Sequence, residues 1–430
     1  MSGILEKIRF VVSLGKHGAL RTLLRSRRKR RAHQGALKCR AASKARFIGV
    51  TGSSGKSTTT ALLGSILTAA GKVRCQVLYN LYNELLVTMK SIKPDDEFVV
   101  AETAVAKAGD MSPQVELLSP DVAVVTMISM EHYSAFKTRE AIAKEKSALV
   151  SSLPSSGLAI LNADDPLVMG MAAQTSARIV TYGWSEAADY RVMRVAGKFP
   201  ETLTVYLEHK EDTFEIHTKF YGNHFWLPVA AAAAAAIELG LSVEQVQKQI
   251  SGFSGVFGRC SLYEIPNGPR FILDTAKAPY ATLQLAFDVI KDAPGATKWI
   301  VLGQISDYSG NPRTKYKSAY RAARGIADKV VFVGPNSHRS GATDDEVNDG
   351  RFNRFRTVSE AMAHFKANAG KGDLVLIKGS QNMHLERIAL SFDHDVRCLE
   401  EVCGYGFGCQ KCGLYEQPFS EHVSIRKSMK

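Results

Sequence analysis

The sequence lacks the features that would place it across a membrane or in a secretory pathway. No apolar run reaches the roughly 18 to 20 uncharged residues that a membrane-spanning helix needs, and no apolar segment near the N-terminus is followed by a small-residue cleavage site. Internal repeats are also absent. With 430 residues, of which 45% are hydrophobic, the chain is long enough for two or three domains with buried cores. We therefore expect a cytoplasmic globular protein.

Net charge is also missing from most of the chain. The first 46 residues hold 14 lysine and arginine residues against one acid, whereas the other 384 residues hold 41 basic and 41 acidic side chains. The body of the protein therefore has no overall field that would attract a polyanion. A phosphate group of a ligand would have to be bound locally.

The basic N-terminal arm, residues 1–46, contains apolar residues spaced as on one face of a helix, from Ile4 to Leu24. One interpretation is a peripheral contact with the anionic inner surface of the membrane, with the Arg27 to Arg31 cluster against lipid headgroups. A solvated leader, or a helix packed on the body, is the alternative. Nucleic-acid binding is not expected, because no aromatic residues lie among the charges between Arg27 and Arg46.

The rest of the chain predicts an α/β fold. Short apolar strands at residues 46–51, 97–101, 121–128 and 157–161 alternate with helical segments, a pattern typical of a parallel sheet covered on both faces. A hairpin is expected around residues 203–216. A second α/β unit has expected strands at 270–274, 299–302, 329–333 and 374–377. The predicted domains are an arm (1–46), a central domain (47–255), a C-terminal domain (256–396) and a cysteine-rich tail (397–430).

A glycine-rich turn joins the first strand to the first helix. Backbone amides of such a turn and of a helix N-terminus converge on one point, where they bind phosphate oxygens. Lys56 adds a cation, and the Ser57 hydroxyl can bind Mg²⁺. The spacing differs from the usual G-x-x-x-x-G-K-[ST] motif, because Val50 stands where that motif has its first glycine. We predict that ATP phosphates bind to Gly52, Ser53, Ser54, Gly55, Lys56, Ser57 and Thr58.

Further motifs follow in order between residues 47 and 390, and together they resemble the Mur ligase family. They are Gly49 to Thr60, Ala101-Glu102 with Gly109-Asp110, Glu131-His132, Ala143 to Lys146, Leu161 to Pro166, Gly222 to His224, Gly258-Arg259, Asp274 to Pro279, Val301 to Gly303, and Lys378 to Ser380 with Met383 and Glu386. The resemblance implies a P-loop parallel-sheet central ATPase domain followed by a Rossmann-like C-terminal domain. Lys378-Gly-Ser380 favours the D-alanyl-D-alanine-adding type.

The resemblance also implies a reaction. Members of the family join a carboxylate to an amine by transferring the γ-phosphoryl group of ATP to the carboxylate, in cell-wall or related peptide synthesis. Such a site needs cations and preorganised donors, since every reactant except the amine is anionic. By resemblance, Lys56, His132 and Lys146 are catalytic; Ser57, Glu102, His132 and a carbamylated Lys146 bind Mg²⁺; Asn162, Arg259 and Asp274 bind nucleotide; and Lys378 and Ser380 bind substrate.

Three departures from the family pattern leave other functions open. Only 46 residues precede Phe47, so we expect no nucleotide-sugar domain. Phe225 to Pro228 stand where the family has adenine-binding asparagines, and Lys277 replaces a histidine. A ligase similar to folylpolyglutamate synthase is an alternative, although a Ser-Pro-His-Leu folate-loop segment is absent. A nonenzymatic ATP-binding subunit that regulates a partner ligase is another.

The tail contains four of the seven cysteines. Cys409 and Cys412 have the C-x-x-C spacing of a metal knuckle, and Cys398 and Cys403 lie within the same fifteen residues. In a chain without a secretion signal, such a cluster favours a metal over disulfides. The sequence therefore offers these four cysteines as candidate Zn²⁺ ligands.

Overall fold

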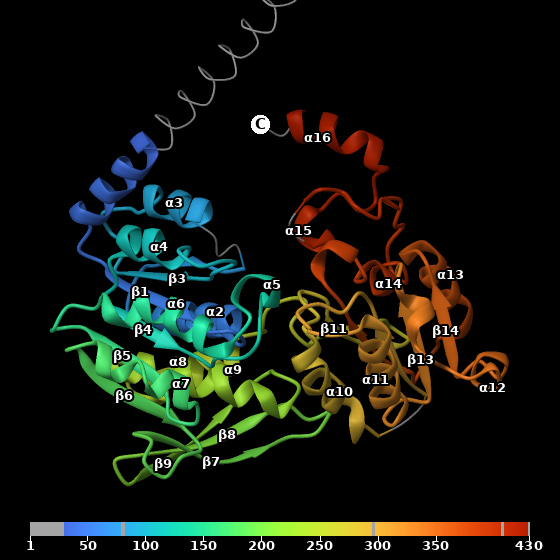
Figure 1. Ribbon diagram of the computed structural model, residues 1–430, viewed down its shortest axis with the longest axis horizontal. Helices are drawn as coiled ribbons and strands as arrows, with labels where there is room; N and C mark the ends of the chain where they lie inside the picture. Colours follow the sequence, from blue (N-terminus) through green and yellow to red (C-terminus); the bar gives the residue numbers. More distant parts are fainter. Residues whose placement is uncertain (1–29, 79–81, 295–296, 406–407, 429–430) are drawn as a thin grey trace, which may run out of the picture.

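The computed structural model describes residues 30–78, 82–294, 297–405 and 408–428. Its chain folds into two α/β domains, each built on a mainly parallel sheet, which lie side by side in Figure 1. The sequence prediction of two successive α/β units is confirmed by this architecture. Within the described ranges, no helix is both long enough and apolar enough to cross a membrane.

The sheet of the first domain has nine strands in the order β2-β3-β1-β4-β5-β6-β7-β8-β9. Neighbours from β2 to β7 are parallel, and β7, β8 and β9 form an antiparallel meander. The strands are β1 (Arg46–Thr51), β2 (Val73–Gln76), β3 (Phe98–Glu102), β4 (Val122–Val125), β5 (Leu158–Asn162), β6 (Arg178–Gly183), β7 (Tyr190–Ala196), β8 (Thr204–His209) and β9 (Asp212–His217).

Helices cover both faces of this sheet, as continuous apolar runs in its strands predict. One apolar cluster contains residues of α2 (Lys56–Leu67), α8 (Trp226–Glu238) and α9 (Val243–Gly252). The cluster on the other face contains residues of α3 (Tyr82–Lys90), α4 (Met111–Leu118) and α6 (Arg139–Ser151). The short helices α5 (Tyr133–Phe136) and α7 (Pro166–Met169) follow β4 and β5.

Helix α8 packs directly against α2, the helix that begins at the phosphate loop. Every residue from Val229 to Ala236 is completely buried, and seven of these eight residues are alanine. Alanine side chains are small, so the two helix backbones can approach closely while leaving little empty volume. The alanine run therefore sets the distance between α2 and the centre of the domain.

The second domain has a six-stranded sheet in the order β10-β11-β15-β12-β13-β14, in which only the β10–β11 pair is antiparallel. Its strands are β10 (Ser261–Glu264), β11 (Arg270–Asp274), β12 (Lys298–Leu302), β13 (Lys329–Val333), β14 (Phe352–Phe355) and β15 (Leu374–Lys378). Its helices are α10 (Leu283–Lys291), α11 (Pro312–Arg324), α12 (Asp344–Asn348), α13 (Val358–Asn368) and α14 (Arg387–Leu390).

The expected hairpin at residues 203–216 is confirmed as the antiparallel pair β8 and β9. Strands β2, β6, β7, β10 and β14 were not anticipated. Strands β2, β10 and β14 have four residues each, and each has at most one buried position, so they carry no continuous buried apolar run.

Part of the basic arm packs on the first domain. A helix covers residues 30–42, in which Ala36 is completely buried. The Arg40 guanidinium donates to the carbonyl oxygens of Leu118 (2.9 Å) and Ser119 (2.7 Å) and lies 3.7 Å from the ring centroid of Phe47. The predicted membrane contact of residues 1–29 lies outside the described residues, whereas residues 30–42 follow the packed-helix alternative.

The tail, residues 397–428, lies against the second domain near α13 and α14 in Figure 1. It contains the one-turn helix α15 (Cys409–Cys412) and the terminal helix α16 (His422–Ser428). The backbone amides of Arg397 and Cys398 both donate to the carbonyl oxygen of Tyr415, which folds the tail back on itself.

Candidate active site

The phosphate loop has the backbone conformation that the sequence predicts for it. Gly52 has φ 138°, and a Cβ atom there would lie 1.9 Å from Thr126 Oγ1. Gly55 has φ 82° and caps the N-terminus of α2, which begins at Lys56. Both conformations favour glycine. The first turn of α2, whose residues Lys56, Ser57 and Thr58 line the cavity, therefore follows a glycine turn of the kind that can bind an anion.

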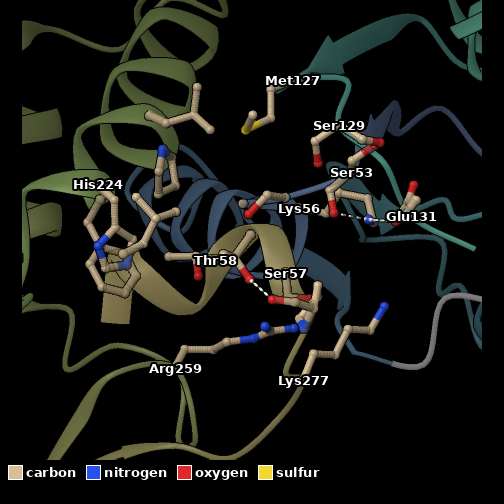
Figure 2. Close-up of a pocket in the computed structure, with 18 of the residues that line it drawn as sticks. Ser53, Lys56, Ser57, Thr58, Met127, Ser129, Glu131, His224, Arg259 and Lys277 are labelled. Atoms are coloured by element: carbon tan, nitrogen blue, oxygen red, sulfur yellow. Dashed lines mark hydrogen bonds and ion pairs between the residues drawn. The ribbon is translucent and has the colours of Figure 1, made fainter. Parts of the chain in front are cut away.

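Lys56 lies beneath this loop in a buried cluster of charges. Its Nζ donates to the carbonyl oxygen of Gly52 at 2.6 Å and lies 3.9 Å from Glu131 Oε2. Lys146 Nζ also donates to Gly52 O, at 2.9 Å, and lies 2.8 Å from Glu131 Oε1. Two lysines and one carboxylate therefore hold the start of the loop, and Figure 2 shows Lys56 beside Glu131.

Burial and charge oppose each other within this cluster. Burial alone would raise the pKa of Glu131, but the nearby Lys56 and Lys146 cations lower it to about 2. Burial lowers the pKa of Lys146 to about 8, although Glu131 partly counteracts this shift. Glu131 is therefore a stable carboxylate, and Lys146 releases its proton more readily than an exposed lysine.

Glu102 and Ser57 line the same cavity as the phosphate loop. Glu102 ends β3 in register with Val50 of β1, which places its carboxylate beside the start of the loop. The side chain is 1% exposed, and Oε2 accepts a hydrogen bond from the Leu78 amide at 3.0 Å. Carboxylate and hydroxyl oxygens are the ligands that Mg²⁺ prefers, so these two residues fit the predicted Mg²⁺ site.

The other two predicted metal ligands do not line the cavity. Lys146 is completely buried below the loop. His132 has φ 47°, begins the turn into α5, and its amide donates to Asp307 Oδ1 at 3.0 Å. Burial lowers the pKa of His132. Its neighbour Glu131 occupies the cavity wall instead, a position that sequence reasoning missed although it quoted the Glu-His pair.

The predicted nucleotide residue Asn162 lines the cavity, but its side chain also organises the loop after β5. Its Nδ2 donates to Thr126 O at 2.8 Å, and its Oδ1 accepts from the Asp164 amide at 3.0 Å. Asp164 in turn accepts from the amides of Trp184 and Ser185. The local role of these side chains is therefore turn formation.

The second domain contributes cations to the opposite wall. Arg259 and Lys277 line the cavity, and in Figure 2 both approach the Lys56 to Thr58 end of α2. Desolvation in the cleft lowers the pKa of Lys277, and the nearby cations Lys56 and Arg259 lower it further. Lys277, which sequence reasoning noted only as a replacement for histidine, is therefore part of a cluster of positive charge built from both domains.

Asp274 and Lys378 form a buried ion pair at the ends of β11 and β15. These residues are in register in the parallel pair, and Lys378 Nζ donates to Asp274 Oδ2 at 2.6 Å and to Lys277 O at 2.7 Å. Both line the cavity. The predicted substrate residue Ser380 does not line it; its hydroxyl donates to Asn382 Oδ1 at 2.7 Å.

Apolar and aromatic residues form another wall of the cavity. Phe225, Trp226, Leu227 and Pro228 line it next to His224, whose ring lies 4.3 Å from that of Phe225. Burial lowers the pKa of His224 to about 4, so this imidazole is neutral at physiological pH. Where the family has asparagines, this chain offers a surface suited to stacking a planar base.

The cavity between the domains has a volume of about 590 Å³. It joins a glycine-rich turn at a helix N-terminus, buried carboxylates and cations from a second domain, an arrangement suited to nucleotide-dependent group transfer. The chain belongs to the Mur ligase family: residues 50–236 match the Mur ligase middle domain, and residues 258–381 match the Mur ligase glutamate ligase domain. It is an ATP-dependent ligase that forms amide bonds.

Similar proteins cover most of the chain. The UDP-N-acetylmuramoyl-tripeptide–D-alanyl-D-alanine ligase of Bacillus subtilis is 28% identical over 348 residues, which are 80% of this chain and 75% of that protein. The Mycobacterium tuberculosis H37Rv enzyme of the same name is 27% identical over 383 residues, covering 83% and 74%.

Solved structures show the same fold. The structure of MurF from Acinetobacter baumannii superimposes with a TM-score of 0.74 at 23% identity, covering 84% of this chain and 79% of that one. MurF from Thermotoga maritima, solved in complex with ADP, gives a TM-score of 0.73 at 21% identity, covering 84% and 83%.

Proposed function

We propose that this ligase joins a carboxylate of a peptide precursor to the amine of an amino acid or dipeptide, as the names of its D-alanyl-D-alanine-adding relatives describe for those enzymes. The proposal rests on one observation: three cations, Lys56, Arg259 and Lys277, line the same cavity. Three cations from two domains suit a reaction whose nucleotide, acid and intermediate are all anionic.

The reaction has two steps. An oxygen of the substrate carboxylate attacks the γ-phosphorus of ATP, and the bond from that phosphorus to the bridging oxygen breaks, giving an acyl-phosphate and ADP. The amine nitrogen then attacks the acyl carbon, the carbon–oxygen bond to phosphate breaks, and the nitrogen loses a proton. Lys56, Arg259 and Lys277 would offset the negative charge that moves between these oxygens. Enclosure between the domains protects the acyl-phosphate from water.

Mg²⁺ is expected with ATP in this family. Ser57 and Glu102 would hold it, since both line the cavity beside the phosphate loop and present hard oxygen donors. When bound there, the ion neutralises charge on the phosphates.

The carbamate that the resemblance implies on Lys146 would convert a cation into an anion, so the ion pair between Lys146 and Glu131 would have to open. Labelling with ¹³C-bicarbonate and detection of a carbamate carbon by NMR tests that modification.

An isotope experiment tests the proposed chemistry. A peptide acid labelled with oxygen-18 in its carboxylate transfers one labelled oxygen to inorganic phosphate if an acyl-phosphate forms, and mass spectrometry of the phosphate detects it. Two substrate pairs are assayed in parallel, each with the label in its acid: UDP-N-acetylmuramoyl-tripeptide with D-alanyl-D-alanine, and a folate with glutamate. Label transfer only in the folate arm would support the folylpolyglutamate alternative. Unlabelled phosphate with a confirmed amide product would falsify the acyl-phosphate route.

We also propose that residues 1–29 bring the enzyme to the inner surface of the membrane. The support is their excess of cations among helically spaced apolar residues. Co-sedimentation of the full chain with anionic vesicles and with neutral vesicles tests this proposal. Binding to anionic vesicles that disappears when residues 1–29 are deleted is expected, whereas equal binding after deletion would overturn it.

A further inference from the structure

A second, much smaller pocket lies between the tail and the segment that follows β15. All four tail cysteines line it, together with His384 and His422. Its volume is about 10 Å³, which is room for about one water-sized sphere. The pocket can therefore accept a single ion but no organic ligand. All of its cysteines are free thiols.

Two donor side chains that line this pocket, His384 and Cys409, lie close to a third, Glu386, which is buried beside the pocket. Within the part of the chain that the structure describes, His384, Glu386 and Cys409 form the one group of three metal-binding side chains whose ligand atoms all lie within 4.8 Å of each other. Cys409 Sγ is 3.5 Å from His384 Nδ1. Bond lengths of about 2.0 Å for zinc–nitrogen and 2.3 Å for zinc–sulfur give a similar separation between tetrahedral ligands, about 3.5 Å.

Hydrogen bonds orient these donors toward the centre of the group. His384 Nε2 lies 3.1 Å from Cys403 Sγ, so a proton on Nε2 leaves the lone pair of Nδ1 directed at Cys409. Glu386 is 1% exposed; its Oε1 accepts from the Cys409 amide at 2.7 Å, while its buried Oε2 has no hydrogen-bond partner. An unpartnered buried carboxylate oxygen is costly, and a cation would satisfy it.

A second histidine, His422, also lines the pocket. His422 is 2% exposed, and its Nε2 contacts the Gln417 carbonyl oxygen at 3.1 Å. Its Nδ1 is buried and has no partner. His422 lies outside the group of three donors described above, so it is a neighbour of the site and not one of its proposed ligands.

Two arginines place positive charge against the sulfur atoms. Arg387, which is 2% exposed, donates to Cys409 Sγ at 3.1 Å and to Cys398 Sγ at 3.5 Å. Arg426 donates to Cys412 Sγ at 2.9 Å. Arg387 is a buried cation and needs a negative partner; metal-bound cysteines are thiolates, whereas free thiols are neutral. The arginines therefore suit a metal-bound form of the cluster.

We propose that this pocket binds one thiophilic divalent cation of the zinc class, with Cys409, His384 and Glu386 as three ligands and a second tail cysteine as the fourth. The sequence predicted a site with four cysteine ligands, whereas the geometry indicates that His384 and Glu386 replace two of them. Cys412 is the fourth ligand that we favour, because it shares the one-turn helix α15 with Cys409. Gly413, with φ 68°, ends that helix, as in a C-x-x-C metal-binding turn.

The position of this site gives it a structural role in the ligase. His384 lies six residues after Lys378, which lines the active-site cavity, and the segment between them forms the turn at Gln381–Met383. A bound ion would join the tail to this segment. Metal removal should therefore loosen the segment after β15 and raise the KM of the acid or amine by about 3-fold or more, with a smaller change in the KM of ATP.

Metal content of the purified full chain tests the proposal. We expect about one zinc per chain by elemental analysis, and cobalt substitution should give the visible bands of tetrahedral Co²⁺ with thiolate charge transfer. Cys409→Ser should lose the metal, while Cys39→Ser, outside the pocket, should keep it. No stoichiometric metal, and no cobalt spectrum after reconstitution, would overturn the site.

A second pair of variants tests the donor set even if Cys409→Ser fails to fold. Glu386→Gln and His384→Asn should each weaken cobalt binding at least 10-fold in a chelator competition and shift the cobalt spectrum. Unchanged affinity and spectrum in both variants would overturn the mixed donor set in favour of four cysteines. Loss of metal without any change in amide synthesis would overturn the link to the segment after β15.

Discussion

Glu131 Oε1 and Lys146 Nζ lie 2.8 Å apart beneath the phosphate loop, where Lys146 is fully buried. Removing the carboxylate would leave two lysines without their shared anion. We predict that Glu131→Gln lowers the free energy of unfolding by about 3–5 kcal/mol, the usual cost of removing one member of a buried ion pair. Denaturant unfolding measures this change. Glu116→Gln, at a side chain that is 63% exposed, should have almost no effect.

Lys56 should be required for turnover because it is the cation of the phosphate loop. Lys56→Ala is expected to reduce kcat by about 100-fold to 1,000-fold, the effect of losing one preorganised donor to the transition state. Release of ADP in a coupled assay measures the rate. Lys90→Ala, on the surface at the end of α3, should retain full activity. Intact turnover in Lys56→Ala would remove the basis of the assigned site.

Lys277 tests whether the second domain supplies charge to the reaction. We predict that Lys277→Ala lowers kcat/KM for ATP by about 10-fold or more, and that Lys277→Arg restores most of the loss, because the missing contribution is a positive charge near Lys56. Steady-state kinetics measure both parameters. Lys291→Ala, in the same domain and exposed at the end of α10, is the matched control. Equal rates for wild type and Lys277→Ala would contradict a charge role.

His224 should make stability depend on pH in the acidic range. Burial lowers its pKa from 6.5 to about 4, so between these values the unfolded chain binds a proton that the folded chain does not. Stability contributed by the neutral imidazole is complete above pH 6.5 and is lost as the pH falls toward 4, by at most about 3 kcal/mol. Denaturant unfolding at several pH values should give a shallower slope for His224→Gln. An unchanged slope would argue against a buried neutral histidine.

Local sequence was sufficient to predict the phosphate loop, because strand, glycine turn and helix are contiguous and each follows from its own residue types. The role of Glu131 was not predictable in this way. It depends on Lys56 and Lys146, which reach Glu131 only when β1, β4 and α6 pack together. Asp274 and Lys378 were both selected from sequence, yet their pairing follows from the adjacency of β11 and β15 in the sheet.

The same distinction applies to the tail. Its cysteines were evident as candidate ligands, since their spacing is visible in the sequence. His384 and Glu386 were not, because they precede the tail and join it only through the fold of the segment after β15. The basic arm is a further case: the sequence left open whether it is solvated or packed on the body, and the fold brings Arg40 to backbone carbonyls at the end of α4.

The alanine run of α8 has a consequence for mutational tolerance far from the chemistry. Ala232 and Ala233 are completely buried in α8, which packs against α2, so added methyl groups there would overpack the region around these two helices. Overpacking of this kind costs about 1–3 kcal/mol and moves backbone. Because Lys56 is the first residue of α2, such a displacement would carry the anion-binding turn with it. Substitutions that place larger side chains in this alanine run should therefore weaken nucleotide binding even in a chain that still folds.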